Sequence, residues 1–143
     1  MSVETGAAYK LISLPNIFDP RGNVIVGEFE RSVPFAVKRF FMIYQVPLTQ
    51  IRGEHAHKRC QQLILAARGG ISVIADDGAC RKEFRLDRPD FGVYLPPMVW
   101  ATQYNYTPDA LLLVFASEFY DKDDYIRDYT EFKALIKLHP VRV

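Results

Sequence analysis

Residues 52–78 read RGEHAHKRCQQLILAARGGISVIADDG, and their pattern sets the architecture expected of the whole chain. Residues 55–67 and 71–75 are predicted strands, and glycine-containing turns follow them at residues 68–70 and 76–78. Glycine adopts the positive φ angles that tight turns require. Similar β-branched and aromatic runs recur about every ten residues, which is typical of an all-β sandwich or barrel.

The rest of the chain continues this pattern until its last part. Further predicted strands cover residues 9–14, 23–30, 38–46, 80–86, 91–95, 99–104 and 110–117. Apolar residues from Tyr125 to Leu138 then recur at spacings of three and four, which predicts one C-terminal helix. We expect this helix to begin at Asp123 and Asp124 and to end before Pro140.

Length and composition fit one globular domain. The chain has 143 residues, of which 49% are apolar and 24% charged, and this excludes disordered and low-complexity classes. A formal net charge of +1 argues against nucleic acid as a partner. No apolar run reaches the ~20 residues of a membrane span, and no signal pattern opens the chain. We therefore expect a cytoplasmic protein without a membrane partner, with a flexible tail over residues 1–8 and one domain over residues 9–143.

Two of the three histidines, His55 and His57, lie in the first predicted strand. Side chains alternate across a strand, so both histidines are expected on one face, with Arg59 and Gln61 continuing the row. In the mouth of a barrel, such a pair would titrate near neutral pH and one imidazole could act as a base. The alternative is a pair of structural polar residues on a solvated edge.

The spacing of these histidines resembles the first motif of the cupin superfamily. In that motif a glutamate follows the His-x-His pair, but here Gln61 or Gln62 occupies its place. The second cupin motif would supply another histidine near Pro96 and Pro97, and none is found there. A transition-metal site needs three or four His, Cys or carboxylate ligands. We therefore predict no metal and no other cofactor, and expect Cys60 and Cys80 to be reduced core residues.

Five blocks resemble a more specific family, the nucleotide-sugar 3,4-ketoisomerases. They cover residues 19–23, 33–39, 52–58, 76–78 and 116–127. The resemblance implies a cupin, or jelly-roll, β-barrel with one C-terminal helix. It also implies conversion of dTDP-4-keto-6-deoxyglucose to the 3-keto sugar, on the way to amino sugars of bacterial glycans. The alternatives are a non-catalytic cupin module that binds a nucleotide sugar and a metal-dependent cupin.

The resemblance makes His57 and His55 the acid/base pair, with His57 as the preferred base and His55 as its orienting or donating partner. Arginine suits the pyrophosphate of the substrate, and Arg21, Arg39 and Arg52 lie in matched blocks. Hydrogen-bond donors for an enediolate are also needed. The remaining candidates for substrate binding are Gln61, Gln62, Tyr104 and Tyr44.

One position departs from the family, since Ala101 follows Trp100 where a basic residue is usual. This change weakens any inference about the exact sugar or the configuration at C4. The family resemblance further implies a homodimer. The unbroken apolar run at residues 63–67 agrees, because both of its faces must be covered. Exchange of the N-terminal strands at residues 9–14 and 23–30 would provide such a dimer.

Overall fold

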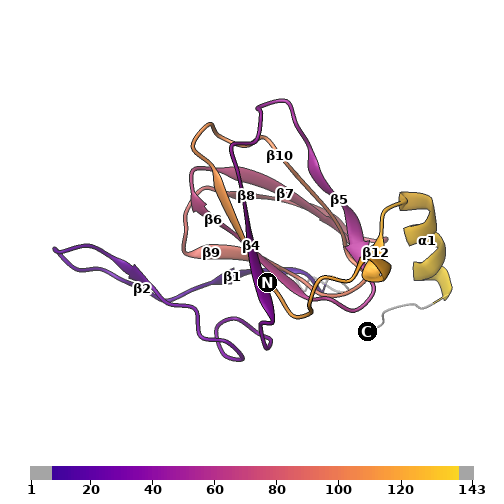
Figure 1. Cartoon of the computed structure of the whole chain (residues 1–143), viewed down its shortest axis with the longest axis horizontal. Helices are drawn as coiled ribbons and strands as arrows, with labels where there is room; N and C mark the ends of the chain where they lie inside the picture. The colour runs from indigo at the N-terminus through magenta and orange to yellow at the C-terminus, as the bar shows by residue number, and fades with distance from the viewer. Residues whose placement is uncertain (1–7, 139–143) are drawn as a thin grey trace.

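The computed structural model describes residues 8–138 and consists mainly of two five-stranded antiparallel sheets that form a barrel (Figure 1). The first sheet contains, in spatial order, β1 (Lys10–Ser13), β9 (Phe91–Leu95), β6 (Gln62–Arg68), β11 (Leu111–Ala116) and β4 (Arg39–Tyr44). The second contains β12 (Tyr125–Ile126), β5 (Arg52–His57), β10 (Trp100–Tyr104), β7 (Ile71–Asp76) and β8 (Arg81–Leu86). Most neighbours within a sheet are distant in sequence, as in a jelly roll, so the predicted fold class is confirmed.

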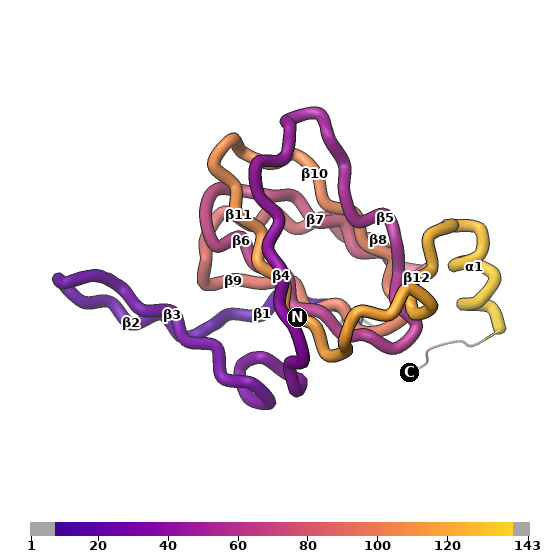
Figure 2. Tube along the Cα trace, viewed as in Figure 1, coloured from indigo at the N-terminus to yellow at the C-terminus, as the bar shows by residue number. Residues whose placement is uncertain are grey.

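A two-stranded hairpin of β2 (Asn16–Ile17) and β3 (Val24–Ile25) projects away from the barrel, as Figure 2 shows. The sequence predicts a strand over residues 23–30 here, and that prediction is wrong beyond Ile25 except for an isolated bridge between Phe29 and Val33. The sequence explains the turn of this hairpin, because Gly22 has a φ of 130°, which glycine adopts more readily than other residues.

The main core lies between the two sheets and is built from alternate residues of nearly every strand. Ile64, Val73, Val93 and Leu112 are completely buried within it. The other face of β6 is covered as well, because Leu63 and Leu65 pack against Leu14, Val33 and Phe35 from the N-terminal segment. This chain's own residues therefore account for the unbroken apolar run in β6.

The strand predicted over residues 55–67 is wrong in one respect that matters for function. The chain leaves the second sheet after His57, turns through residues 58–61 and enters the first sheet at Gln62. Arg59 and Gln61 therefore do not continue the row of His55 and His57. Backbone N–H groups in the turn bind Asp124 instead of a neighbouring strand, and an alternation rule cannot anticipate this bend.

The predicted C-terminal helix begins later than expected. Residues Lys122–Asp124 form a short 3₁₀ helix, η1, and β12 follows it, so the α-helix α1 covers only Tyr129–Leu138. Asp128 caps α1, with its carboxylate accepting a hydrogen bond from the backbone N–H of Thr130 at 2.8 Å. Phe132 is fully buried and anchors α1 against Ala56 and Ile126.

Three smaller expectations have mixed outcomes. Both cysteines are free, but only Cys60 is buried and Cys80 is exposed, so Cys80 is not a core residue. The tail predicted over residues 1–8, apart from Ala8, and Pro140 lie outside the described residues. Within the described part of the chain, no helix is long and apolar enough to cross a membrane.

Candidate active site

His55 and His57 lie on the inner face of β5, as their alternation predicts. Their ring centroids are 4.9 Å apart and the rings meet edge to face, at 85°. Ala56, between them, points to the opposite face and is completely buried against α1. The pair is therefore fixed by the packing of the strand that carries it, and the predicted common face is confirmed.

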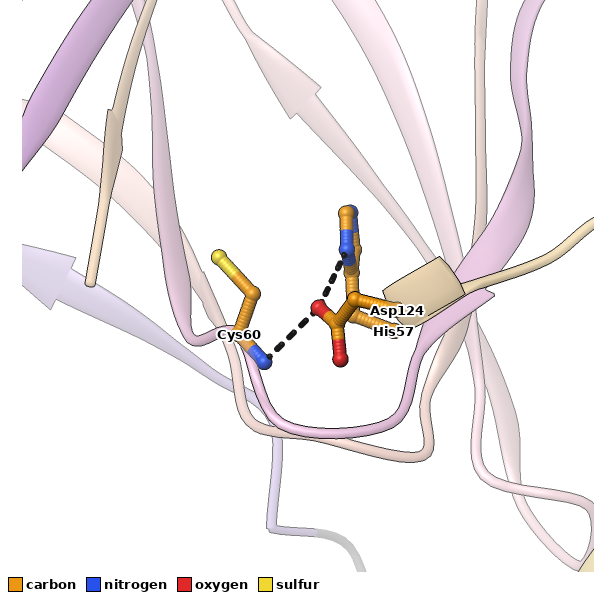
Figure 3. Close-up of side chains that lie close together, drawn as sticks. All are labelled: His57, Cys60 and Asp124. Carbon is orange, nitrogen blue, oxygen red and sulfur yellow. Dashed lines mark hydrogen bonds and ion pairs between the residues drawn. The ribbon is translucent and has the colours of Figure 1, made fainter. Parts of the chain in front are cut away.

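His57 is held by Asp124, as Figure 3 shows. Its Nδ1 lies 3.2 Å from Asp124 Oδ2, while the backbone N–H groups of Arg59 and Cys60 donate to the same carboxylate at 2.7 and 3.2 Å. Burial lowers the pKa of His57, and the hydrogen bond that its Nδ1 donates to Asp124 opposes this only in part. A neutral imidazole that donates from Nδ1 has a free lone pair on Nε2. That atom is buried and has no hydrogen-bond partner in the described structure.

His55 has a different second partner, because its Nδ1 bonds to the carbonyl of Gly53. A carbonyl only accepts, so Nδ1 carries the proton and Nε2 is an acceptor. Burial and the neighbouring His57 lower the pKa of His55 to about 4. Gly53 is required at this bend, since its φ is 90° and an added Cβ would lie 3.1 Å from the carbonyl oxygen of Ala101.

Strand β12 and the residue that follows it bring two further side chains to the histidines. Tyr125 is opposite His57 in the register of β12 and β5, and its ring centroid lies 4.4 Å from His57 and 4.9 Å from His55. The guanidinium carbon of Arg127 lies 4.3 Å from the Tyr125 ring centroid. A positive charge is thus held at the edge of the site without a carboxylate partner among the ion pairs described.

Two cavities meet at His55. The open one has a volume of about 200 Å³ and is lined by Phe41, Ile43, Arg52, Gly53, His55, Gln62, Gln103, Val114, Tyr125 and Arg127. A second, smaller one is lined by His55, His57, Cys60, Gln62, Leu95, Pro96, Val99 and Ala101. Because His55 and Gln62 border both, a ligand that enters the open cavity reaches the edge of the smaller one.

His57, Cys60 and Asp124 are also the one group of three metal-ligating side chains found among the described residues. Their nearest ligand atoms all lie within 4.8 Å of one another. Both oxygens of Asp124 already accept hydrogen bonds, from His57 and from the backbone. The carboxylate is therefore better arranged to orient the imidazole than to bind a metal directly.

The FdtA family, described as WxcM-like, C-terminal, matches residues 7–137. The chain belongs to this family. A curated relative from Aneurinibacillus thermoaerophilus, TDP-4-oxo-6-deoxy-alpha-D-glucose-3,4-oxoisomerase, is 38% identical over 127 residues, which are 89% of this chain and 91% of the relative. The resemblance to sugar 3,4-ketoisomerases is therefore confirmed.

Solved structures agree with this FdtA-family assignment. A 3,4-ketoisomerase from Helicobacter canadensis is 34% identical, with a TM-score of 0.88 over 92% of this chain and 99% of its own. The 3,4-ketoisomerase QdtA from Thermoanaerobacterium thermosaccharolyticum, solved as a histidine-to-asparagine mutant with TDP-4-keto-6-deoxyglucose, is 30% identical. Its TM-score is 0.89 over 94% of this chain and 97% of its own.

Three residues predicted to bind substrate lie around the histidines of this FdtA-family chain. Arg52 and Gln62 line the open cavity. Arg39, on β4, donates from Nε to the backbone carbonyl of Glu118 at 2.9 Å, and its positive charge contributes to the lowered pKa of His57. The structure thus brings two predicted arginines and one predicted amide to the two histidines.

Two other residues predicted to bind substrate, Gln61 and Tyr104, point away from the two histidines. The Oε1 of Gln61 accepts a hydrogen bond from the Tyr94 hydroxyl at 2.7 Å, on the outer face of the first sheet. The Tyr104 hydroxyl donates to Glu83, and Tyr104 lines a groove on the outer face of the second sheet. Alternation along β10 explains this, because Ala101 and Gln103 take the inward positions.

The last two residues predicted to bind substrate, Arg21 and Tyr44, lie on exposed parts of the β2–β3 hairpin and of the first sheet. Arg21 is at the turn between β2 and β3, with its side chain 89% exposed and paired to Asp19 at 2.9 Å. Tyr44 ends β4 and is also exposed. Neither residue contacts the histidines within the described chain.

Sequence reasoning missed Asp124, Tyr125 and Arg127 as site residues. All three belong to the matched block at residues 116–127, but the apolar residues from Tyr125 onward recur at spacings of three and four, and this spacing predicted a helix. A signal was present in the alternation of Tyr125 and Arg127, which would put both on one face of a strand. The connection from Asp124 to His57 is a tertiary contact that no local pattern contains.

Proposed function

We propose that this chain interconverts a TDP-linked 4-keto-6-deoxyhexose and its 3-keto isomer, with His57 as the base. The observation that carries the proposal is the buried, unpartnered Nε2 of His57, with Asp124 fixing the opposite nitrogen. The substrate class is supported by the A. thermoaerophilus relative and by the sugar nucleotide in the QdtA complex.

The chemistry needs only proton transfers. The C4 ketone acidifies the C3 proton, and Nε2 of His57 is an acceptor suited to remove it. Negative charge then develops on the C4 oxygen, where Arg52 and Arg127 supply positive charge at the cavity wall. Protonated His57 is stabilised by Asp124 and returns the proton to C4. The C3 hydroxyl proton is removed by a neighbouring acceptor and delivered to the C4 oxygen, which leaves a C3 ketone and a C4 hydroxyl, so atoms and electrons balance within the sugar.

His55 is suited to accept the proton of the C3 hydroxyl group. Since its Nδ1 donates to Gly53, the free Nε2 is an acceptor and not a donor. Its low pKa keeps it neutral at physiological pH. We therefore assign to His55 acceptance of the C3 hydroxyl hydrogen, in place of the orienting or donating function expected from the sequence.

The decisive experiment is incubation of purified protein with TDP-4-keto-6-deoxyglucose, with the products separated by anion exchange and identified by NMR. Appearance of a TDP-3-keto-6-deoxyhexose supports the proposal. Tight binding without conversion would instead support the non-catalytic cupin module. Metal analysis of active enzyme tests the prediction that catalysis is metal-independent, and the cytoplasmic location stays a prediction.

We also propose a homodimer. The β2–β3 hairpin exposes Ile17, Phe18 and Val24, and β4, at the edge of its sheet, exposes Phe40 and Met42. A free edge with exposed apolar side chains favours pairing with another chain. The hairpin projects from its own barrel and is the N-terminal segment that we propose is exchanged.

Such an exchange would give Arg21 a function, since the hairpin that carries it projects from its own barrel. Sedimentation at micromolar concentration is expected to show a dimer, and the double substitution Phe40→Glu and Met42→Glu is expected to give a monomer. A wild-type monomer would overturn the proposal.

A further inference from the structure

Two glutamine side chains in the open cavity lack hydrogen-bond partners. Gln62, on β6, and Gln103, on β10, are each only 6% exposed, and both line the cavity that contains His55. Neither side-chain amide makes a hydrogen bond to another residue within residues 8–138. Buried amides nearly always have a partner, so two free amides that face one cavity indicate a polar ligand there.

The fold holds the amide of Gln103 close to His55. Gln103 is opposite Arg52 where β10 pairs with β5, and the register of the two strands shifts between Ala101 and Gln103. The amide packs over Gly53, since a carbon added to this glycine would lie 3.0 Å from Gln103 Oε1. The carbonyl of the same glycine binds Nδ1 of His55. Gln103 therefore contacts the residue that orients this imidazole.

The two amides differ in chemistry from the other polar groups of the cavity. Arg52 and Arg127 only donate hydrogen bonds, whereas Nε2 of His55 accepts them. A carboxamide does both, and so does a hydroxyl group. Gln62 comes from the first sheet and Gln103 from the second. A hydroxyl group between them accepts a hydrogen bond from one amide and donates one to the other.

We propose that Gln62 and Gln103 bind the C2 hydroxyl group of the sugar and make the enzyme discriminate against 2-deoxy sugars. The assignment rests on the proposed function, in which His55 takes the C3 hydroxyl proton and two arginines face the C4 oxygen. The methyl group on C5 is apolar and suits the apolar wall that Phe41 and Ile43 provide. Apart from the nucleotide linkage at C1, the C2 hydroxyl is the ring substituent that remains.

Binding of the stable analogues TDP-glucose and TDP-2-deoxyglucose, measured by calorimetry on the full chain, tests the site without turnover. The wild type should bind TDP-glucose at least about tenfold more tightly, because the analogue without the hydroxyl leaves buried amides unpaired. Gln62→Met and Gln103→Met should each reduce this preference, and the double variant should abolish it. Affinity for TDP-2-deoxyglucose should stay the same in all of them.

Gln61→Met is the matched control, because the amide of Gln61 is bound by Tyr94 on the outer face of the first sheet. This variant should keep the wild-type preference for TDP-glucose. Equal affinity of the wild type for the two analogues would overturn the proposal, whatever the variants do.

Thermal unfolding separates an amide that binds ligand from one that supports the fold. Neither Gln62 nor Gln103 has a side-chain partner within residues 8–138, so methionine should not lower the melting temperature of the unliganded protein. A marked decrease in both variants would show a structural function and contradict the proposal.

Turnover distinguishes a failure of this site from a failure of the proposed function. For the wild type, kcat/KM with TDP-4-keto-6-deoxyglucose should exceed that with its 2-deoxy counterpart by at least about 100-fold, and the double variant should lose most of this ratio. Conversion of both at equal kcat/KM would contradict the hydroxyl site and leave the isomerase intact. Preferential binding of TDP-glucose without any conversion would contradict the proposed function and support the hydroxyl site, and failure to bind either analogue would contradict both.

Discussion

The Nδ1 of His57 lies 3.2 Å from Oδ2 of Asp124, and both side chains are almost completely buried. Asp124 comes from η1, which precedes β12 and the C-terminal helix, and contacts the last residue of β5. Because the same carboxylate accepts two backbone hydrogen bonds from the turn after β5, its position does not depend on the imidazole. The imidazole of His57 is therefore oriented by a residue that lies 67 positions away in the sequence.

Asp124→Asn should lower kcat/KM by about 10²- to 10⁴-fold, because the imidazole loses both its orientation and the charge that stabilises its protonated form. The carboxylate also raises the pKa of His57, so the acid limb of the remaining activity should move to lower pH. Asp121→Asn is the control, since Asp121 pairs with Arg59 at the surface. Equal loss in both variants, without a change in the pH profile, would contradict a positioning function.

The buried histidines should make folding stability depend on pH. His55 has a pKa of about 4 in the folded chain and 6.5 as its ordinary value. Between these values the unfolded state binds more protons, so stability is complete above pH 6.5 and is lost as the pH falls toward 4. Each such histidine contributes a slope of up to about 1.4 kcal/mol per pH unit.

Denaturant unfolding of His55→Asn across this pH range measures the effect. As the pH falls, the free energy of unfolding of the variant should decrease less steeply than that of the wild type. The slope should be smaller by up to the contribution of one histidine, and the pH dependence that remains comes from His57, whose pKa is also lowered. An unchanged slope would mean that His55 is not buried in its neutral form.

Gly53→Ala should destabilise the fold by about 1–3 kcal/mol, because alanine is strained at a φ of 90°. The added carbon would also lie 3.0 Å from Gln103 Oε1, so that the cavity wall shifts and activity falls. Gly27→Ala is the control, since its added carbon makes an ordinary contact of 3.4 Å with Val33. Chemical denaturation of both variants tests this, and equal stability of the two would be inconsistent with the required bend.

Arg127→Gln should lower kcat by about 10²- to 10³-fold, as expected when a fixed donor to a developing oxyanion is removed. Its charge also lowers the pKa of both histidines, so both should titrate at higher pH in the variant. Arg81→Gln, in the groove on the outer face of the second sheet, should change neither quantity. Histidine titration by NMR and steady-state kinetics measure the two effects.

The sequence was sufficient for the barrel and for the common face of His55 and His57 because both depend on local alternation. The strands at residues 71–75 and 91–95 need only their own residues and flanking turns, and His55 and His57 share a face by strand geometry alone. The bend at residues 58–61 is different, because Asp124 binds its backbone from a distant position.

Local sequence patterns were also insufficient for the residues predicted to bind substrate. Residue type could nominate Tyr104 and Gln61 as hydrogen-bond donors, but the direction of each side chain depends on register. Ala101 and Gln103 face inward on β10, which leaves Tyr104 on the outside. For Gln61, the chain has already left one sheet and not yet entered the next, so no strand rule determines its direction.

The most direct test of the central claim is proton NMR of the enzyme with TDP-4-keto-6-deoxyglucose in deuterated water, for the wild type and for His57→Asn. The wild type should exchange the C3 proton for deuterium and form the 3-keto sugar, and His57→Asn should do neither while still binding the nucleotide sugar. Exchange at C3 at the wild-type rate in His57→Asn would contradict the assignment of His57 as the base.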